Sequence, residues 1–173
     1  QGLKPLREAT QRLREAFHMQ ADRHSNDIKI GRTQLQDAVP MTYGQEIHAW
    51  ASFLATDLEA MNTLAKRLCV FNLGATAIGT GICADLRFRH TATTVLAEIT
   101  DLPITAASDP VAAVTDTSSY IEASAVLKNL AVHLKKAADD LRLLNSGPRC
   151  GFGDLTVPPR QAGSSIMPGK INP

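Results

Sequence analysis

The sequence has 173 residues, with 18 Lys and Arg against 17 Asp and Glu, which gives a formal net charge of +1. This length allows one domain with a sizeable core, and the near-neutral charge gives no long-range attraction to nucleic acid or acidic membranes. No apolar run reaches the ~20 residues of a membrane helix, and the first residues lack a signal-peptide pattern. We therefore expect a cytoplasmic protein that binds neither nucleic acid nor membranes.

The cysteines do not form a recognisable site. Cys69, Cys83 and Cys150 are odd in number and widely spaced, with neither CxxC nor CxxxH spacing. Such a set predicts reduced thiols rather than a disulfide framework or a zinc site. We expect no bound metal or cofactor.

An amphipathic helix is predicted first, from Leu3 to about Ala21, because its apolar residues fall near helical spacing among charged ones. It ends at a turn-forming cluster within residues 22–27. The next segment, residues 28–40, has no clear period and crowds polar donors and acceptors together. A short strand would account for Ile28 and Ile30.

A long helix is predicted to begin after Thr42, since Gln45 lies at the spacing of a capping box. Its apolar residues recur in alternating steps of four and three. They are Ile47, Ala51, Leu54, Leu58, Met61, Ala65 and Leu68. This heptad pattern predicts packing against another helix at a shallow crossing angle.

Glycines then interrupt the helical pattern at residues 74–81, which predicts a tight turn between helices. The alternative, a phosphate-binding loop, lacks the GxxxxGK[ST] pattern and the strand-to-helix context. A shorter helix is predicted at about Asp85 to Thr100, ended by Leu102-Pro103.

A second long helix is predicted to begin between Pro110 and Ser118 and to end near Leu144. Its seam repeats the same steps at Tyr120, Ala123, Leu127, Leu130, Leu134, Ala137, Leu141 and Leu144. At 1.5 Å per residue, each long helix spans on the order of 40 Å, and rods of this length are usually shared between subunits. We predict an all-α fold, a bundle of long helices whose core is shared between subunits. A Gly/Pro-rich connection follows at residues 150–160, in which 155–157 is a candidate brief strand.

The last stretch, residues 163–173, carries the chemically most suggestive side chains. Ser164, Ser165, Lys170 and Asn172 lie on a segment with two Gly and two Pro, which predicts a loop. A serine can act as a base or nucleophile when activated, a lysine can hold an anion, and an amide can orient a carboxylate. From composition alone, such a serine pair is more often part of a flexible linker than a catalytic group, so both interpretations stay open. Thr33 and Gln34 are likewise either a polar turn or binding residues.

Four separated segments together resemble, in order, the fumarase/aspartase superfamily of lyases. Residues 163–173 resemble its GSSxMPxKxNP signature, and the other segments are residues 31–46, 72–81 and 146–151. The resemblance covers essentially the whole chain. It implies that residues 1–173 are part of the central helical domain, ending in the signature loop 163–173, without the N-terminal and C-terminal domains of that family.

Within this family, Gln34 favours the aspartase branch. Fumarases have a histidine at this position of the motif, GRTH, whereas this sequence has a glutamine, GRTQ. The sequence NLGAT at residues 72–76 also favours the aspartase branch. The aspartase branch implies reversible deamination of L-aspartate to fumarate and ammonia. Two alternatives remain: a fumarate hydratase, and a non-catalytic structural or assembly module, since the superfamily also includes lens crystallins.

The resemblance also implies roles for the site residues. Ser164 is the implied general base, and the implied substrate-binding residues are Thr33, Gln34, Ser165, Lys170 and Asn172. The family works as a homotetramer whose active sites combine segments of three subunits, on a small dicarboxylate substrate. We therefore expect the 173-residue chain to be inactive alone.

Overall fold

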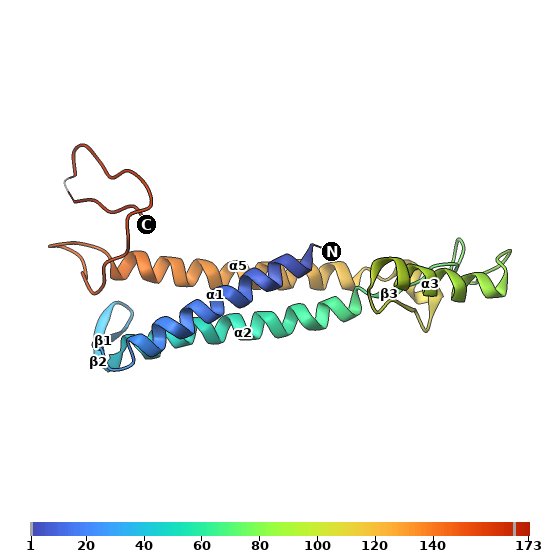
Figure 1. The fold of residues 1–173 in the computed structure, drawn as a ribbon, viewed down its shortest axis with the longest axis horizontal. Helices are drawn as coiled ribbons and strands as arrows, with labels where there is room; N and C mark the ends of the chain where they lie inside the picture. The colour runs from blue at the N-terminus through green and yellow to red at the C-terminus, as the bar shows by residue number, and fades with distance from the viewer. Residues whose placement is uncertain (1, 168) are drawn as a thin grey trace. The chain divides into compact units, whose positions relative to one another are not determined.

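The structure, a computed structural model, describes residues 2–167 and 169–173. Its helices are α1 (Leu3–Arg23), α2 (Tyr43–Arg67), α3 (Leu86–Thr100), α4 (Pro110–Thr115) and α5 (Ser118–Leu144). Its strands are β1 (Ile28–Thr33), β2 (Gln36–Thr42), β3 (Val70–Phe71) and β4 (Thr105–Ala106), paired as β1–β2 and β3–β4. Figure 1 shows that helices dominate, as the sequence predicted. None of the described helices combines the length and apolar character that crossing a bilayer requires.

The chain divides into two compact units. The first contains the described residues up to Thr10 together with Ala55–Asn129. The second contains the described residues of Gln11–Leu54 and Leu130–Pro173. All six residues for which the sequence suggested a chemical role belong to the second unit.

In the second unit, three helices supply the buried apolar side chains. These are Ala21 of α1, Trp50, Ala51 and Leu54 of α2, and Leu130, Ala137 and Leu144 of α5. The Trp50 ring lies 5.7 Å from the Phe17 ring, centroid to centroid, and its indole N–H donates to Asp140 at 3.3 Å. Burying an indole requires a partner for its N–H, and the Asp140 carboxylate provides one.

The predicted capping box at the start of α2 is confirmed. The Gln45 N–H donates to Thr42 Oγ1 at 3.1 Å, and the Thr42 N–H donates to Gln45 Oε1 at 2.9 Å. The Gly44 N–H donates to the His24 carbonyl at 2.9 Å, just after α1 ends. Backbone groups that a helix start leaves without partners are satisfied in this way. These hydrogen bonds fix the position at which α2 begins after the β1–β2 hairpin.

The segment between α1 and α2 is a hairpin rather than the single strand that Ile28 and Ile30 suggested. β1 and β2 pair antiparallel from Ile28 opposite Thr42 to Thr33 opposite Gln36. The sequence did not reveal β2, because its exposed side chains show no alternation of apolar and polar residues. Figure 1 shows the hairpin joining the end of α1 to the start of α2.

In the first unit, Met61 and Leu64 of α2 and Val126 of α5 are buried. Asp57 of α2 is fully buried, and its carboxylate accepts a hydrogen bond from Asn129 Nδ2 of α5 at 3.0 Å. A polar pair of this kind favours one alignment of the two helices over others, because a shifted alignment would leave a buried carboxylate without its donor.

Side-chain caps set the limits of the shorter helices in the first unit. Asp85 caps α3 by accepting from the Arg87 N–H, and Asp101 ends it in the left-handed conformation. Asp109 caps α4 by accepting from two N–H groups. Between α2 and α3, Gly74, Gly79 and Gly81 all have positive φ, which agrees with the tight turn predicted there.

The buried faces of the long helices differ in part from the predicted seams. On α2, Asp57 and Leu64 are buried where the pattern predicted Leu58 and Ala65, which are half-buried. On α5, Val126 is buried, whereas Leu127 is 47% exposed. Two adjacent stripes of each helix fit a heptad spacing. The prediction chose the stripe of α2 that contains only apolar residues. In the structure the buried stripe of α2 includes Asp57, which is hydrogen-bonded to Asn129.

Candidate active site

The tip of the β1–β2 hairpin carries Thr33 and Gln34. Thr33 pairs with Gln36, which leaves Gln34 and Leu35 as the connecting residues. Their φ angles are 49° and 60°, so both adopt the left-handed conformation that Asn and Gly usually occupy in such a turn. For residues with longer side chains this conformation costs of order 1–3 kcal/mol each. Contacts elsewhere must therefore hold the tip in place.

The strongest of these contacts joins Arg32 to Asp154. Arg32 Nη1 lies 2.6 Å from Asp154 Oδ2, and Nη2 lies 3.4 Å from Oδ1, while only 17% and 14% of the two side chains are exposed. Arg32 also donates to Asp37 of β2 at 3.1 Å and lies over the Phe152 ring. The hydrogen bond that Arg32 donates to Asp154 raises the pKa of Arg32, and this effect outweighs burial, which lowers that pKa.

A second ion pair supports the base of the hairpin. Lys29 Nζ of β1 lies 2.5 Å from Glu46 Oε2 of α2, and only 4% of the lysine side chain is exposed. Tyr43, the first residue of α2, donates its hydroxyl to the backbone carbonyl of Asp154. Burial raises the pKa of the Tyr43 phenol, and the negative charge of Asp154 adds to this effect. Strand β1 is thus bound to α2, and the start of α2 is bound in turn to Asp154.

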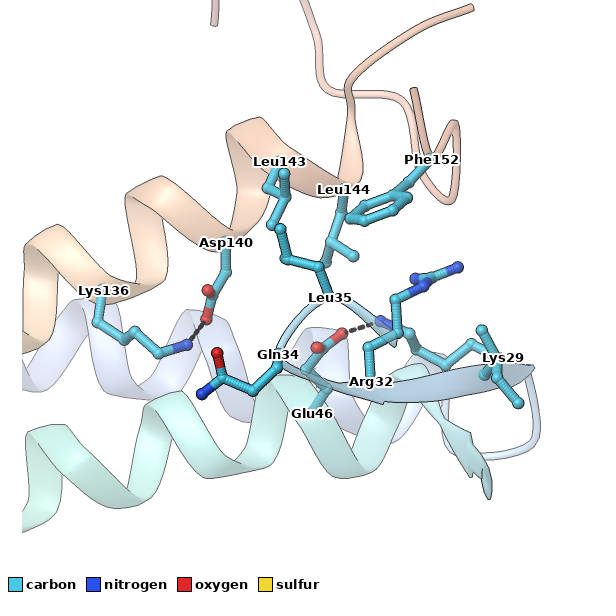
Figure 2. A pocket seen from close by; sticks show the side chains of 11 residues that line it. Lys29, Arg32, Gln34, Leu35, Glu46, Lys136, Asp140, Leu143, Leu144 and Phe152 are labelled. Carbon is cyan, nitrogen blue, oxygen red and sulfur yellow. Dashed lines mark hydrogen bonds and ion pairs between the residues drawn. The ribbon is translucent and has the colours of Figure 1, made fainter. Parts of the chain in front are cut away.

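A cavity of about 340 Å³ lies beneath the hairpin tip. It is lined by Lys29, Ile30, Arg32, Gln34, Leu35, Glu46, Lys136, Asp140, Leu143, Leu144 and Phe152. Figure 2 shows Gln34 on the same side as Lys136 and Asp140 of α5, and these two residues form an ion pair. The other cations that line the cavity, Lys29 and Arg32, are also paired with acids. The cavity therefore presents balanced charge and the Gln34 amide.

The C-terminal loop carries the other candidate residues. Its ends meet where Gln161 and Asn172 form an antiparallel bridge, and Figure 1 shows the closed outline in red. The Asn172 amide donates to the Ala162 carbonyl at 2.6 Å, and the Asn172 carbonyl accepts from the Arg160 N–H at 2.8 Å. Asn172, an implied substrate-binding residue, thus closes the base of the loop.

Inside the loop, Ser164 is half-buried and Ser165 and Lys170 are exposed. Ser164 Oγ accepts a hydrogen bond from the Ile166 N–H at 3.3 Å. Within residues 2–167 and 169–173, the Lys170 ammonium has no hydrogen bond or ion pair and is free to bind an anion. Pro168 of the motif lies outside the described residues.

Comparison with known proteins assigns the sequence to a family. It matches a family described as lyase over residues 1–173. The chain belongs to this lyase family. Curated aspartate ammonia-lyases of the family are 45–50% identical to it. That of Corynebacterium glutamicum is 46% identical over 99% of this chain and 33% of its own length. The lyase chain thus spans about a third of the length of the curated relatives it matches.

Solved structures agree with this assignment and with the helical-bundle fold. A fumarate lyase:delta crystallin from Brucella melitensis matches with a TM-score of 0.94 and 44% identity, covering 98% of this chain and 37% of that one. A class II fumarase from Schistosoma mansoni matches with a TM-score of 0.90 and 30% identity, covering 96% of this chain and 38% of that one. The predicted resemblance to the fumarase/aspartase superfamily is confirmed, with the aspartase branch the more similar one.

The lyase chain holds its candidate residues in two separate groups. The hairpin tip brings Thr33 and Gln34 together, and the C-terminal loop brings Ser164, Lys170 and Asn172 together. Within residues 2–167 and 169–173, no hydrogen bond or ion pair joins the loop to the hairpin. The hairpin tip and the C-terminal loop can therefore each contribute polar atoms to a ligand separately.

Sequence reasoning missed the residues that support the hairpin of this lyase. Asp154 stood within a connection treated only as Gly/Pro-rich, and the brief strand suggested at 155–157 is irregular in the structure. The signal that could have found it is chemical. Asp154 is the one acidic residue between Asn145 and Pro173, and Arg32 is the cation next to Thr33.

Proposed function

We propose that the protein carrying this chain is an aspartate ammonia-lyase, which converts L-aspartate reversibly to fumarate and ammonia. The observation that carries the proposal is the similarity of nearly the whole chain to curated aspartate ammonia-lyases at 45–50% identity. Gln34 at the hairpin tip supports the same branch, because its neutral amide replaces the titratable imidazole of the GRTH motif.

In the proposed reaction, Ser164 removes a proton from the carbon next to the β-carboxylate of aspartate. The electron pair of the broken carbon–hydrogen bond first moves onto the β-carboxylate group. It then returns to form the double bond of fumarate as the carbon–nitrogen bond breaks and ammonia leaves. The intermediate carries two negative charges on the β-carboxylate group, so donors around that group lower the barrier. Lys170, Asn172 and the N–H of Ser165 are the proposed donors.

The contacts of the loop are compatible with these roles. Ser164 Oγ already accepts one backbone N–H, which helps to stabilise negative charge on that oxygen. The Lys170 side chain is exposed and available to an anion. Asn172 uses its Nδ2 within the loop, so its Oδ1 and the remaining amide hydrogen are available to a ligand. Thr33 and Gln34 are proposed to bind the substrate from the hairpin tip.

We propose that the protein is a cytoplasmic homotetramer assembled through its long helices. Along α5, Tyr120, Leu127 and Leu134 recur every seven residues and are 73%, 47% and 37% exposed. A second apolar stripe beside the buried one favours packing against helices of further copies. Light scattering of the purified protein should give the mass of four subunits, and a monomer would contradict this assembly.

We also propose that residues 1–173 represent part of the central helical domain of the enzyme and are inactive alone. The chain matches about a third of the length of its relatives, and within residues 2–167 and 169–173 no hydrogen bond or ion pair joins its two candidate groups of residues. Fumarate formation from L-aspartate by the 173-residue chain, abolished by Ser164→Ala, would refute this part of the proposal.

Substrate discrimination tests the central proposal. The complete protein is assayed by the ultraviolet absorbance of fumarate, with L-aspartate and with L-malate as separate substrates. Turnover of L-aspartate alone is expected. The alternative, a class II fumarase, has the structural match to the Schistosoma mansoni enzyme in its favour. Turnover of L-malate alone would establish that alternative.

A further inference from the structure

Asp154 lies where three elements of the second unit meet. Its carboxylate binds Arg32 of β1, and its backbone carbonyl accepts the hydroxyl of Tyr43 at the start of α2. Its N–H donates to the carbonyl of Leu144, the last residue of α5, at 2.9 Å. A single residue thus uses its donor, its acceptor and its charge on three different elements. Its own position is fixed by the last carbonyl of a long helix.

The contact between Asp154 and Arg32 has the geometry of a strong pair. Two N–H groups of the guanidinium face two carboxylate oxygens, which fixes orientation as well as distance. Both side chains are largely shielded from water, so screening weakens the pair less than it would a surface pair. The Phe152 ring, 4.2 Å from the guanidinium, covers its face. Arg32 therefore has little freedom to move.

Arg32 directly precedes the turn that needs support. Thr33 follows it, and Gln34 and Leu35 have φ angles that their side chains disfavour. A turn of this kind lacks the Asn-Gly sequence that would make it stable by itself. When Arg32 is released, the tip can relax toward more favourable backbone angles, and Thr33 and Gln34 then change direction.

We infer that Asp154 is a positioning residue for catalysis, which aims Thr33 and Gln34 at the substrate by holding Arg32. The inference rests on the proposed function, since it assumes that these two side chains bind the substrate. Asp154 itself has no role in the chemical step. Its replacement should weaken substrate binding and leave the rate of the bound complex nearly unchanged.

The test compares four single variants and one double variant of the complete protein. Asp154→Asn removes the charge, and Asp154→Glu keeps a carboxylate. Arg32→Lys keeps the charge but loses the fork of two N–H groups. Asp139→Asn is the matched control, because Asp139 forms an exposed ion pair with Lys135 on the surface of α5.

For Asp154→Asn and Arg32→Lys, the KM for L-aspartate is expected to rise about tenfold while kcat stays within about twofold. The KM of Asp154→Glu should lie between those of Asp154→Asn and the wild type, and the KM of Asp139→Asn should equal that of the wild type. A double variant of Asp154→Asn and Arg32→Lys should lose clearly less than the two single losses combined, because both break the Arg32–Asp154 contact. The hydrogen bond of Arg32 to Asp37 and the ion pair of Asp154 with Lys29 at 3.9 Å each belong to one variant only. If Asp154→Asn lowers thermal stability and leaves KM unchanged, the role is structural and the inference is wrong.

Hydrogen exchange separates this inference from the proposed function. Asp154→Asn should speed amide exchange in residues 31–38 of the complete protein, whether or not it turns over aspartate. If the wild type fails to deaminate L-aspartate, the proposed function fails, and the exchange rates still decide whether Asp154 holds the tip. Unchanged exchange in residues 31–38 overturns the inference even in an active enzyme.

Discussion

Gly163→Ala perturbs the C-terminal loop at its tightest point. A Cβ at Gly163 would lie 2.8 Å from the Lys170 carbonyl oxygen, whereas an ordinary contact begins at 3.4 Å. The carbonyl must therefore move by about 0.6 Å, the difference between these distances. It cannot move freely, because Asn172 is hydrogen-bonded to Arg160, Gln161 and Ala162. The substitution thus opposes the closure of the loop around Ser164.

Overpacking of this kind costs about 1–3 kcal/mol. If this free energy opposes formation of the closed loop, kcat/KM for L-aspartate should fall about five- to hundredfold, since 1.4 kcal/mol corresponds to a factor of ten. The assay is fumarate formation by the complete protein. Gly2→Ala is the control, because nothing lies within 4 Å of a Cβ built there. A Gly163→Ala enzyme with kcat/KM within twofold of the wild type would refute the reasoning.

Two further predictions concern the hairpin. Glu46→Gln removes the nearer carboxylate partner of Lys29, whose side chain is 4% exposed, and leaves only the Asp154 carboxylate at 3.9 Å. We expect a loss of about 2 kcal/mol in local stability, below the 3–5 kcal/mol typical of a fully buried pair because Glu46 is partly exposed. Amide exchange in residues 28–42 should become about 30-fold faster, and unchanged exchange would contradict this. Because burial raises the pKa of Tyr43 in the folded state, its contribution to stability is present below its unfolded pKa of about 10 and is lost at higher pH. The melting temperature should therefore fall more steeply above about pH 10 in the wild type than in Tyr43→Phe, and equal slopes would show that Tyr43 is not responsible.

Helices α1, α2, α3 and α5 were predictable because their signals are local, whereas the separate short helix α4 was not predicted. The spacing of Thr42 and Gln45 gave the start of α2, and the apolar period gave α2 and α5 to within a few residues. The buried faces were less predictable. Asp57 fills the core through a hydrogen bond to Asn129, a residue 72 positions away in sequence, and no local pattern records such a partner.

The candidate site residues could be proposed from sequence motifs, whereas the residues that hold the hairpin in place could not. Thr33 and Ser164 were found because each lies in a segment that resembles a family motif. Their roles stay predictions, since no ligand contact tests them. Asp154 was missed because its importance depends on Arg32, 122 positions away in sequence, and on a helix end that only the fold brings beside it.

The most direct test of the account is the effect of Ser164→Ala on the complete protein. If Ser164 removes the proton, kcat for L-aspartate should fall by at least about 10³-fold, while KM changes only a few-fold, because the binding residues remain. Binding of fumarate, followed by calorimetry, should persist and show that the site is intact. A Ser164→Ala enzyme that retains more than about a tenth of the wild-type kcat would contradict the assignment of Ser164 as the base.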